Sequence, residues 1–279
     1  MHSYRERAGV AEAKQAGRIL IAVPTTGGTV KAKTTDSLVR LMKVLTRNGF
    51  DADIHNIDNS DIVTARNRYA NLVLDSDHWD SLLFIDSDMQ FKPKAILRMI
   101  ALNVPVAAAA CTTRELDLEK FAAAIREHGD MDRARAEASR FNVLRHWGKD
   151  RGAVRTRGNF YALAAVGMAV CLIKKSALQE MIAAGVVDQR IDRFGKGVEL
   201  KSWGFFDLVK VKETAFSEDF SFCHRWSGRM RRPLWVCVDE DINHIGEFAY
   251  SARYLTALGV KPAEEANQKA EAHQAAAAE

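Results

Sequence analysis

Short apolar runs alternate with helical patterns along the first part of the chain, and this alternation restricts the fold more than any other feature. Residues 18–24 and 82–85 read as buried strands, and residues 93–101 and 104–110 continue with a helix and a strand. Chains that alternate in this way form parallel sheets with helices on both faces. We therefore expect an α/β fold with a doubly wound, mostly parallel sheet.

The length of 279 residues and the apolar content of 47% suit one large α/β domain or two small ones. We expect a single domain over residues 18–259, after a polar N-terminal extension of residues 1–17. Two helical patterns that meet at Gly129 predict a helical insertion over residues 116–147. Residues 260–279 are rich in Ala, Glu and Gln and predict a disordered or frayed tail.

Three further segments carry predictions from their local pattern. Residues 192–212 contain glycines and aromatic residues without a clear period, which predicts a mobile loop. Residues 234–238 form the last predicted strand. Residues 250–258 predict a short helix.

Charge, cysteine content and hydropathy narrow the class of protein. A net charge of +4 and a pI near 8.8 are compatible with phosphate-rich ligands, and we expect no nucleic-acid partner. The four cysteines have no paired spacing for zinc or for a disulfide framework, so we expect reduced thiols. No apolar stretch approaches the length of a membrane span, and residues 1–17 lack an apolar signal segment. We expect a cytoplasmic protein with at most peripheral membrane contact.

Asp86-Ser87-Asp88 directly follows the apolar run of residues 82–85 and precedes a helix that starts at Pro93. Open α/β sheets bind ligands where their strands end, and two carboxylates at such a point can hold a hard divalent cation against a phosphate. Other Asp-x-Asp pairs in the chain lack this context and read as turn or cap residues.

Two polar residues lie at positions where the helical spacing predicts buried apolar side chains. Arg66 and Asn67 interrupt the apolar face of a helix that Ser60 or Asp61 can cap. A guanidinium on such a face needs a carboxylate or a ligand, and the sequence leaves both readings open.

Six segments in this order resemble the GT-A glycosyltransferases, especially the inverting family-2-like enzymes. They are the strand at residues 19–23, Ala65-Arg66-Asn67, Phe84-Ile85-Asp86-Ser87-Asp88, Gly167-Met168, Ser217-Glu218-Asp219 and His244-Ile245-Gly246. The resemblance spans residues 18–246 and leaves out the insertion and the tail. It implies a GT-A fold.

The resemblance also implies a metal site and a general base. Asp88 would coordinate a Mn²⁺ or Mg²⁺ ion that bridges the donor diphosphate, with Asp86 near the ribose or the ion and His244 as a further ligand. Asp219 would accept the proton of the acceptor hydroxyl, and Glu218 is the alternative base. The plainer reading makes both acids complements of a helix N-terminus and His244 a surface histidine.

The family positions that hold the nucleotide sugar also map onto this chain. They are Thr25, Asp58, Arg66, Asn67, Asp86, Ser87 and Asp88. Thr25 and Asp58 end adjacent strands of the expected parallel sheet. Trp203 either stacks on the sugar or acceptor or packs in the core.

The implied activity is metal-dependent transfer of a sugar from a nucleotide sugar, with UDP favoured, to a hydroxyl of a carbohydrate, lipid-linked or protein acceptor. Residues 223–226 match the Gln-x-x-Arg-Trp motif of processive members only in their last two positions. This difference and the lack of membrane spans favour a non-processive enzyme. Inversion is favoured over retention, and that preference rests on Asp219.

Three other readings remain open. A nucleotidyltransferase would share the sheet and the metal, but residues 25–31 only faintly resemble its glycine-rich loop. A haloacid-dehalogenase-type phosphatase would carry Thr or Val where this chain has Gln90. An inactive nucleotide-binding module would keep the sheet without the chemistry.

Overall fold

The computed structural model describes residues 17–148, 152–194 and 198–247. The chain divides into two compact units, Met1–Ile245 and Gly246–Glu279. The first unit contains every described helix and strand. The predicted helix at residues 250–258 and the tail at 260–279 lie outside the described residues.

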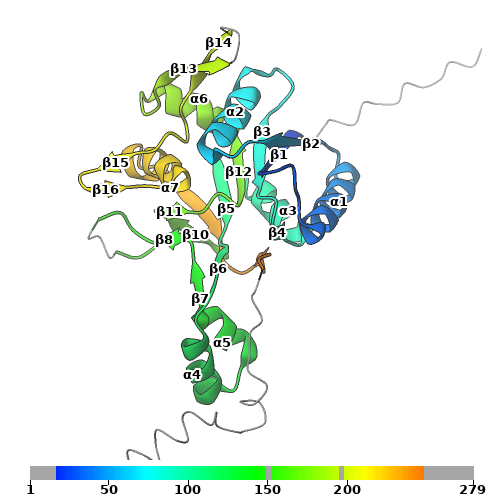
Figure 1. Cartoon of the computed structure of the whole chain (residues 1–279), viewed down its shortest axis with the longest axis vertical. Coiled ribbons are helices and arrows are strands. Elements are labelled where there is room, and N and C mark those ends of the chain that lie inside the picture. Colours follow the sequence, from blue (N-terminus) through cyan, green and yellow to red (C-terminus); the bar gives the residue numbers. More distant parts are fainter. Residues whose placement is uncertain (1–16, 149–151, 195–197, 248–279) are drawn as a thin grey trace, which may run out of the picture. The chain divides into compact units, whose positions relative to one another are not determined.

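The first unit is built on a sheet of eight strands flanked by helices (Figure 1). In spatial order the strands are β2 (Phe50–Asp58), β1 (Gly17–Thr25), β3 (Ser81–Ile85), β12 (Val170–Lys174), β5 (Val106–Ala109), β17 (Leu234–Cys237), β10 (Phe160–Leu163) and β9 (Thr156–Arg157). The α-helices are α1 (Ala32–Arg47), α2 (Ile62–Asp75), α3 (Pro93–Leu102), α4 (Leu118–His128), α5 (Met131–Ala138), α6 (Lys175–Ala183) and α7 (Glu218–Cys223).

Short strands pair outside the large sheet. They are β4 (Met89–Gln90) with β18 (Asn243–His244), β6 (Thr112–Leu116) with β7 (Ser139–Phe141), β8 (Val143–Leu144) with β11 (Ala165–Val166), β13 (Gln189–Phe194) with β14 (Val198–Trp203), and β15 (Lys210–Val211) with β16 (Thr214–Ala215). Because β18 follows β17, the prediction that residues 234–238 form the last strand is wrong. β18 pairs with β4 through Asn243 and His244, and its two residues are too few to show a strand pattern.

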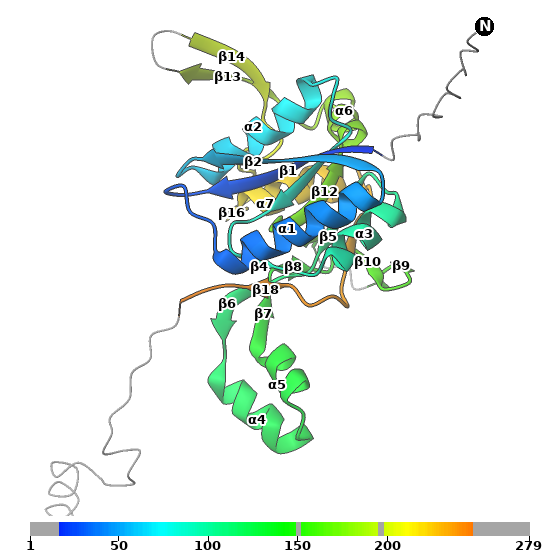
Figure 2. The ribbon, with the colours of Figure 1, turned by 90° about the vertical axis from the view of Figure 1, so that its right-hand side faces the viewer.

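Alternation along the strands divides the core into two clusters, one on each face of the sheet. Leu20 and Ala22 of β1 pack with buried residues of α2, α6 and α7. Ile19 and Ile21 pack with buried residues of α1 and α3. Figure 2 shows α1 on one side of β1 and α2 on the other. The expected α/β architecture with helices on both faces is therefore present.

The sheet is mostly parallel in direction. Strands β2, β1, β3, β5, β17 and β9 run one way, and β12 and β10 run the other. β12 is buried on both faces, so its sequence is a continuous apolar run whichever way it points. This explains why its antiparallel direction is not visible in the sequence.

The segment 116–147 carries α4 and α5 beyond the ribbon of β6 and β7 (Figure 2). The two helices are separated by Gly129, which has a φ of 65° and ends α4 in the left-handed conformation that glycine adopts without strain. Within the described residues, no helix has the length and apolar character needed to cross a bilayer.

The loop predicted over residues 192–212 is wrong for residues 192–194 and 198–203, which lie in strands β13 and β14. Gln189–Phe194 and Val198–Trp203 form an antiparallel pair in regular register, from Gln189 opposite Trp203 to Phe194 opposite Val198. The backbone groups of this segment therefore satisfy one another in a hydrogen-bonded ladder instead of facing water.

Candidate active site

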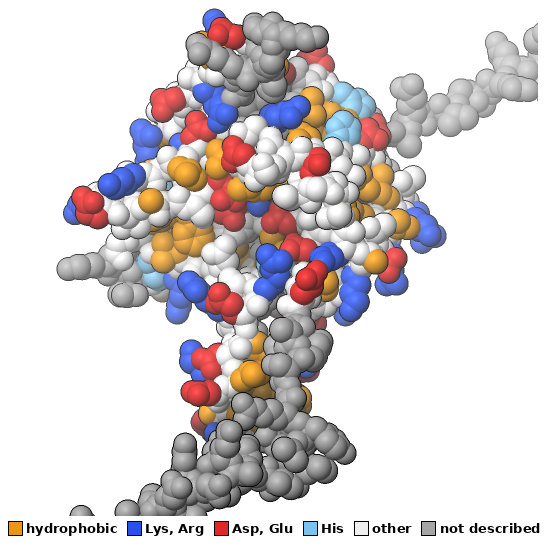
Figure 3. All heavy atoms as spheres, in the orientation of Figure 1, with side chains coloured by type: hydrophobic (Ala, Val, Ile, Leu, Met, Phe, Trp, Pro, Cys, Tyr) orange, Lys and Arg blue, Asp and Glu red, His pale blue; other side chains and the backbone are white. Residues whose placement is uncertain are grey.

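An acidic cavity of about 440 Å³ lies where the strands of the large sheet end. It is lined by Asp86, Met89, Cys111, Thr112, Thr113, Arg114, Glu115, Asn142, Gly167, Ala169, Asp219 and His244. Asp86 directly follows β3, and Cys111 follows β5 by two residues. The carboxyl ends of these strands thus form one wall, which is the position where open α/β sheets bind ligands. Acidic side chains gather near the middle of this face, with Lys and Arg side chains around them (Figure 3).

Arg66 lies at the centre of three carboxylates beside this cavity. Its guanidinium is 3.2 Å from Asp86, 3.3 Å from Asp219 and 3.4 Å from Glu218, and its side chain is 2% exposed. It also lies over the ring of Phe84, 5.0 Å from the centroid. Burial opposes its positive charge, but the three carboxylates outweigh burial and raise the pKa of Arg66. The partner that the sequence demands for Arg66 is therefore a set of acids.

Asp219 lies at the start of α7 with its side chain 13% exposed, and it lines the cavity. Ser217 caps this helix by accepting a hydrogen bond from the amide of Phe220. Burial raises the pKa of Asp219 to about 7, and the neighbouring Arg66 opposes that rise. Its Oδ1 atom lies 3.3 Å from Arg66 Nε and accepts no hydrogen bond from the described part of the chain. A carboxylate with these properties can accept a proton near neutral pH.

His244 lines the cavity and forms a second charged pair with Asp88, which is not among the lining residues. His244 Nε2 lies 3.1 Å from Asp88 Oδ2, and Nδ1 lies 2.9 Å from the carbonyl oxygen of Thr112. Both ring nitrogens therefore face acceptors, which favours the imidazolium form. The hydrogen bond to Asp88 accordingly raises the pKa of His244. Burial acts to raise the pKa of Asp88, but the hydrogen bond and charge of His244, with the charge of Arg114, hold it below its ordinary value.

Asp88 and His244 fit a divalent cation. In the described residues, no group of three or more His, Cys, Asp or Glu side chains is arranged to hold a metal ion. The 3.1 Å between the carboxylate oxygen and Nε2 matches the separation of about 3 Å between adjacent ligands of an octahedral ion. A cation would replace the proton on Nε2, while the hydrogen bond from Nδ1 to Thr112 fixes the ring. Asp86, the other predicted ligand, lines the same cavity and pairs with Arg66 at 3.2 Å, and its place near the ion remains a prediction.

The charge balance of the site points the same way. Its acidic members are Asp86, Asp88, Glu115, Glu218 and Asp219, and its arginines are Arg66, Arg114 and Arg140, of which Arg140 pairs with Glu115. With Asp219 ionised, five carboxylates against three guanidinium groups leave the site two charges negative when His244 is neutral and one charge negative when His244 is an imidazolium. Such a site repels a diphosphate unless a cation is bound with it.

The other predicted residues are not among the lining residues of this cavity. Thr25 and Asp58 are opposite each other in the register of β1 and β2, and Thr25 Oγ1 lies 3.5 Å from Asp58 Oδ1. The carbonyl oxygen of Ser87 accepts a hydrogen bond from the amide of Lys31. Trp203 is not among the lining residues; it packs against the core and exchanges two hydrogen bonds with Asn71.

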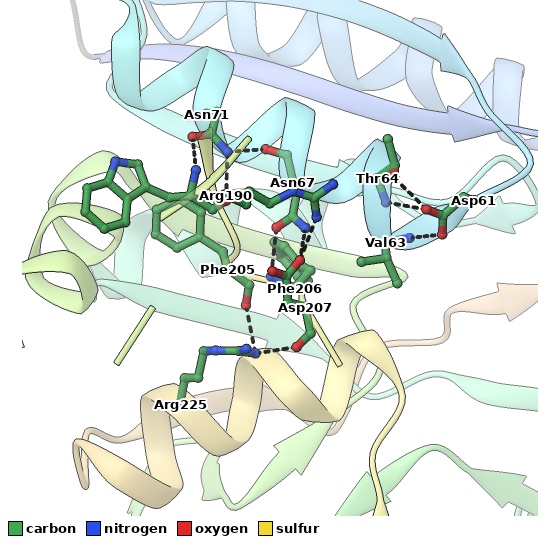
Figure 4. Close-up of polar contacts among 11 residues, drawn as sticks. Asp61, Val63, Thr64, Asn67, Asn71, Arg190, Phe205, Phe206, Asp207 and Arg225 are labelled. Carbon is green, nitrogen blue, oxygen red and sulfur yellow. Dashed lines mark hydrogen bonds and ion pairs between the residues drawn. The ribbon is translucent and has the colours of Figure 1, made fainter. Parts of the chain in front are cut away.

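Asn67 has a clear structural role (Figure 4). Its amide group donates to Asp207 Oδ1 at 2.8 Å and accepts from the backbone amide of Phe206 at 2.9 Å. Asp207 Oδ1 also accepts a hydrogen bond from the guanidinium of Arg190 at 2.7 Å. The backbone carbonyl oxygen of Asp207 accepts one from the guanidinium of Arg225 at 2.7 Å. Asn67 therefore ties α2 to the segment before α7, and its predicted place in a nucleotide site remains a prediction.

Sequence reasoning missed Arg114, Thr112 and Asn142 as members of the site. Arg114 lies 3.6 Å from Asp88, and Thr112 accepts the hydrogen bond of His244. Residues 112–114 follow β5 closely, so the same strand-end argument that selected Asp86 could have found them. Asn142 carried no such signal, because it reaches the cavity through the return strand of the insertion.

No protein-family model matches the chain, and no curated protein sequence matches it. Among solved structures, A197 from STIV aligns with a TM-score of 0.43 and 13% identity over 82% of this chain and 86% of that chain. The 4-diphosphocytidyl-2C-methyl-D-erythritol synthase from Anaerococcus prevotii DSM 20548 aligns with a TM-score of 0.35 and 10% identity over 80% and 88%. Mouse xyloside xylosyltransferase 1 aligns with a TM-score of 0.25 and 8% identity over 58% and 69%. These TM-scores are too low to assign a family or an activity.

Proposed function

We propose that this chain is a glycosyltransferase that depends on a divalent metal and moves a sugar from a UDP-linked donor to an acceptor hydroxyl with inversion. The observation that carries the proposal is that Asp219, with a side chain 13% exposed, lines the same cavity as His244, which pairs with Asp88. One group can accept a proton there, and the other two can hold a cation that balances a diphosphate.

Asp219 accepts the proton of the acceptor hydroxyl while the oxygen of that hydroxyl attacks the anomeric carbon of the donor sugar. The bond between that carbon and the diphosphate oxygen breaks, and its electron pair leaves with the nucleoside diphosphate. Arg66 stabilises the ionised form of Asp219, because its guanidinium is 3.3 Å from the carboxylate. Glu218 and Asp86 share the same guanidinium and hold it in place.

Asp88 and His244 are the residues that would hold the Mn²⁺ or Mg²⁺ ion, and such an ion supplies positive charge against the departing diphosphate. Thr25 and Asp58 would receive the nucleoside, because they stand at the carboxyl ends of β1 and β2. Asp58 is exposed and can accept hydrogen bonds from ribose hydroxyl groups.

Replacing Asp219 by Asn tests the role of the base. Asp219→Asn removes the proton acceptor and keeps the shape, so UDP release from a panel of UDP-sugars should fall by about 10²- to 10⁴-fold. Calorimetric binding of UDP with Mn²⁺ should remain. Asp132→Asn is the matched control, because Asp132 lies on α5 and its side chain is 91% exposed.

Turnover by Asp219→Asn at the wild-type rate would remove Asp219 from the mechanism. Release of pyrophosphate from a nucleoside triphosphate, dependent on Asp88, would assign nucleotidyl transfer instead. Binding of UDP by the wild type without turnover of any donor would assign an inactive nucleotide-binding module.

A further inference from the structure

A second cavity, of about 450 Å³, has the opposite charge to the acidic cavity. We call it the basic cavity. Its charged or titratable lining residues are Arg145, His146, Arg155, Arg231 and Arg232. No described carboxylate belongs to its lining.

The ribbon of β8 and β11 connects the two cavities. Asn142 and Gly167 line the acidic cavity at one end, where the amide of Gly167 donates to the carbonyl of Asn142 at 2.9 Å. Arg145 and Ala164 line the basic cavity at the other end, where the amide of Ala164 donates to the carbonyl of Leu144 at 2.9 Å. From residue 142 to residue 145 an extended chain covers about 10 Å. The two cavities therefore lie about 10 Å apart along this ribbon.

Three of the four arginines of the basic cavity form no ion pair with a described residue. Arg145, Arg155 and Arg231 are these exposed residues, whereas Arg232 pairs with Glu180. Several guanidinium groups that lack an ion pair with the described residues repel one another around one hollow and raise its potential for anions. Guanidinium groups bind phosphate through two parallel hydrogen bonds, which makes phosphate the anion they suit best.

Trp147 gives the basic cavity a fixed aromatic wall. Its indole N–H donates to Ser227 Oγ at 2.8 Å, and Ser227 Oγ donates to the carbonyl of Cys223 at 2.8 Å. The indole also meets the ring of His224 edge to face, with centroids 5.3 Å apart. Held by these contacts, the indole can pack against a ring or an alkyl chain next to a phosphate.

We propose that the basic cavity binds the phosphate group of a phosphate-bearing acceptor whose hydroxyl lies at Asp219 in the acidic cavity. The binding of phosphate stands on the basic cavity alone, and the placement of the acceptor hydroxyl rests on the proposed function. The cavity volume suits a single phosphorylated ring or a lipid phosphate headgroup. The opposite charges of the two cavities keep this phosphate apart from the metal-dependent diphosphate of the donor.

Titration of inorganic pyrophosphate into the full chain in the presence of EDTA tests the phosphate site. The wild type should bind, and Arg145→Ala and Arg231→Ala should each weaken binding about tenfold. Arg126→Ala, at an exposed arginine of α4, should bind as the wild type does. No binding by the wild type, or an equal loss in Arg126→Ala, would overturn the proposal.

Two further probes identify the source of the phosphate. Glucose 6-phosphate tests a soluble acceptor, and phosphatidylcholine vesicles containing phosphatidic acid test a lipid acceptor. If Arg145→Ala weakens the binding of one probe, the result supports the site and identifies the source of the phosphate. If Arg145→Ala leaves the binding of both probes unchanged, the result opposes the site.

This result is separable from that of the proposed function. Pyrophosphate binding that depends on Arg145, without any metal-dependent UDP binding, would keep the basic cavity and remove the glycosyltransferase assignment. Conversely, UDP binding and turnover could depend on metal while pyrophosphate binding is unchanged in Arg145→Ala. That result would keep the glycosyltransferase assignment and rule out the basic cavity as a phosphate site.

Discussion

Arg66 is the residue on which the acidic cluster depends. It is the one guanidinium that contacts Asp86, Glu218 and Asp219 among the described residues, and it is almost wholly buried. A buried ion pair contributes little over an apolar replacement of the whole set, but the loss of one partner leaves the others as uncompensated charges. The cluster is therefore fragile at this single position.

Arg66→Met removes the charge and keeps much of the aliphatic length. We expect the free energy of unfolding at pH 7 to fall by about 3–5 kcal/mol, because three carboxylates lose their counter-charge. Urea denaturation of the variant measures the loss, and Arg40→Met on the exposed side of α1 serves as the control. A loss below about 1 kcal/mol would show that water compensates these carboxylates without Arg66.

The Asp88–His244 pair makes stability depend on pH in the absence of metal. The folded pKa of His244 is raised above its ordinary 6.5, so its stabilising contribution is complete below pH 6.5 and is lost as the pH rises through the folded pKa. The folded pKa of Asp88 is lowered below 3.8, so its contribution is complete above that value and is lost as the pH falls through the folded pKa. The pair is most stabilising between these limits.

His244→Gln should therefore lower the free energy of unfolding by about 1 kcal/mol near pH 5 and by less near pH 9. Urea denaturation in EDTA at both pH values measures the two differences. This account would be rejected if His244→Gln lost the same free energy of unfolding at both pH values, or lost more at the higher pH.

At the scale of elements, polar side chains decide how the hairpin of β13 and β14 is attached. Asn71 of α2 is buried; its amide donates to the carbonyl of Trp203 at 2.9 Å, and its oxygen accepts from the amide of Trp203 at 2.7 Å. An adjacent contact from Asn67 holds the segment that follows β14 (Figure 4). The two asparagines fix this part of the chain to α2.

Asn71→Ala should detach β14 from α2. Two backbone groups of Trp203 lose their partners, which costs about 1–3 kcal/mol of stability. Hydrogen exchange should show faster exchange of the Trp203 amide, with the amides of β1 and β3 changed only by the overall loss of stability. Equal protection of the Trp203 amide in both proteins would mean that Asn71 does not hold this strand.

The elements of the double-layered core could be predicted from the sequence, because strands buried on both faces and helices with caps carry strong local signals. Asp61 accepts hydrogen bonds from the amides of Val63 and Thr64 and caps α2, as its position predicts, and Ser217 caps α7. The hairpin was missed because glycines and aromatic residues obscured the alternation of Val198 and Leu200 with Glu199 and Lys201.

The site could be predicted only in part. Asp86 and Asp88 follow from their place after β3, whereas nothing in local spacing brings His244 to Asp88 across 156 positions of the chain. That pairing came from the family resemblance. The contacts of Arg66 with Glu218 and Asp219 depend on how α2 and α7 meet, which no local pattern encodes.

At the scale of the first unit, the acidic cavity and the basic cavity lie at different places relative to the large sheet. The acidic cavity lies at the strand ends of this sheet, and the ribbon of β8 and β11 runs from there to the basic cavity. The central claim is that Asp88 and His244 hold a divalent ion that binds a nucleoside diphosphate.

Calorimetric titration of UDP into the full chain, with Mn²⁺ and with EDTA, tests this claim most directly. The account predicts that UDP binds with Mn²⁺, that binding is lost in EDTA and in Asp88→Asn, and that Asp132→Asn binds like the wild type. Binding of UDP that is equal in EDTA, or unchanged in Asp88→Asn, would contradict it.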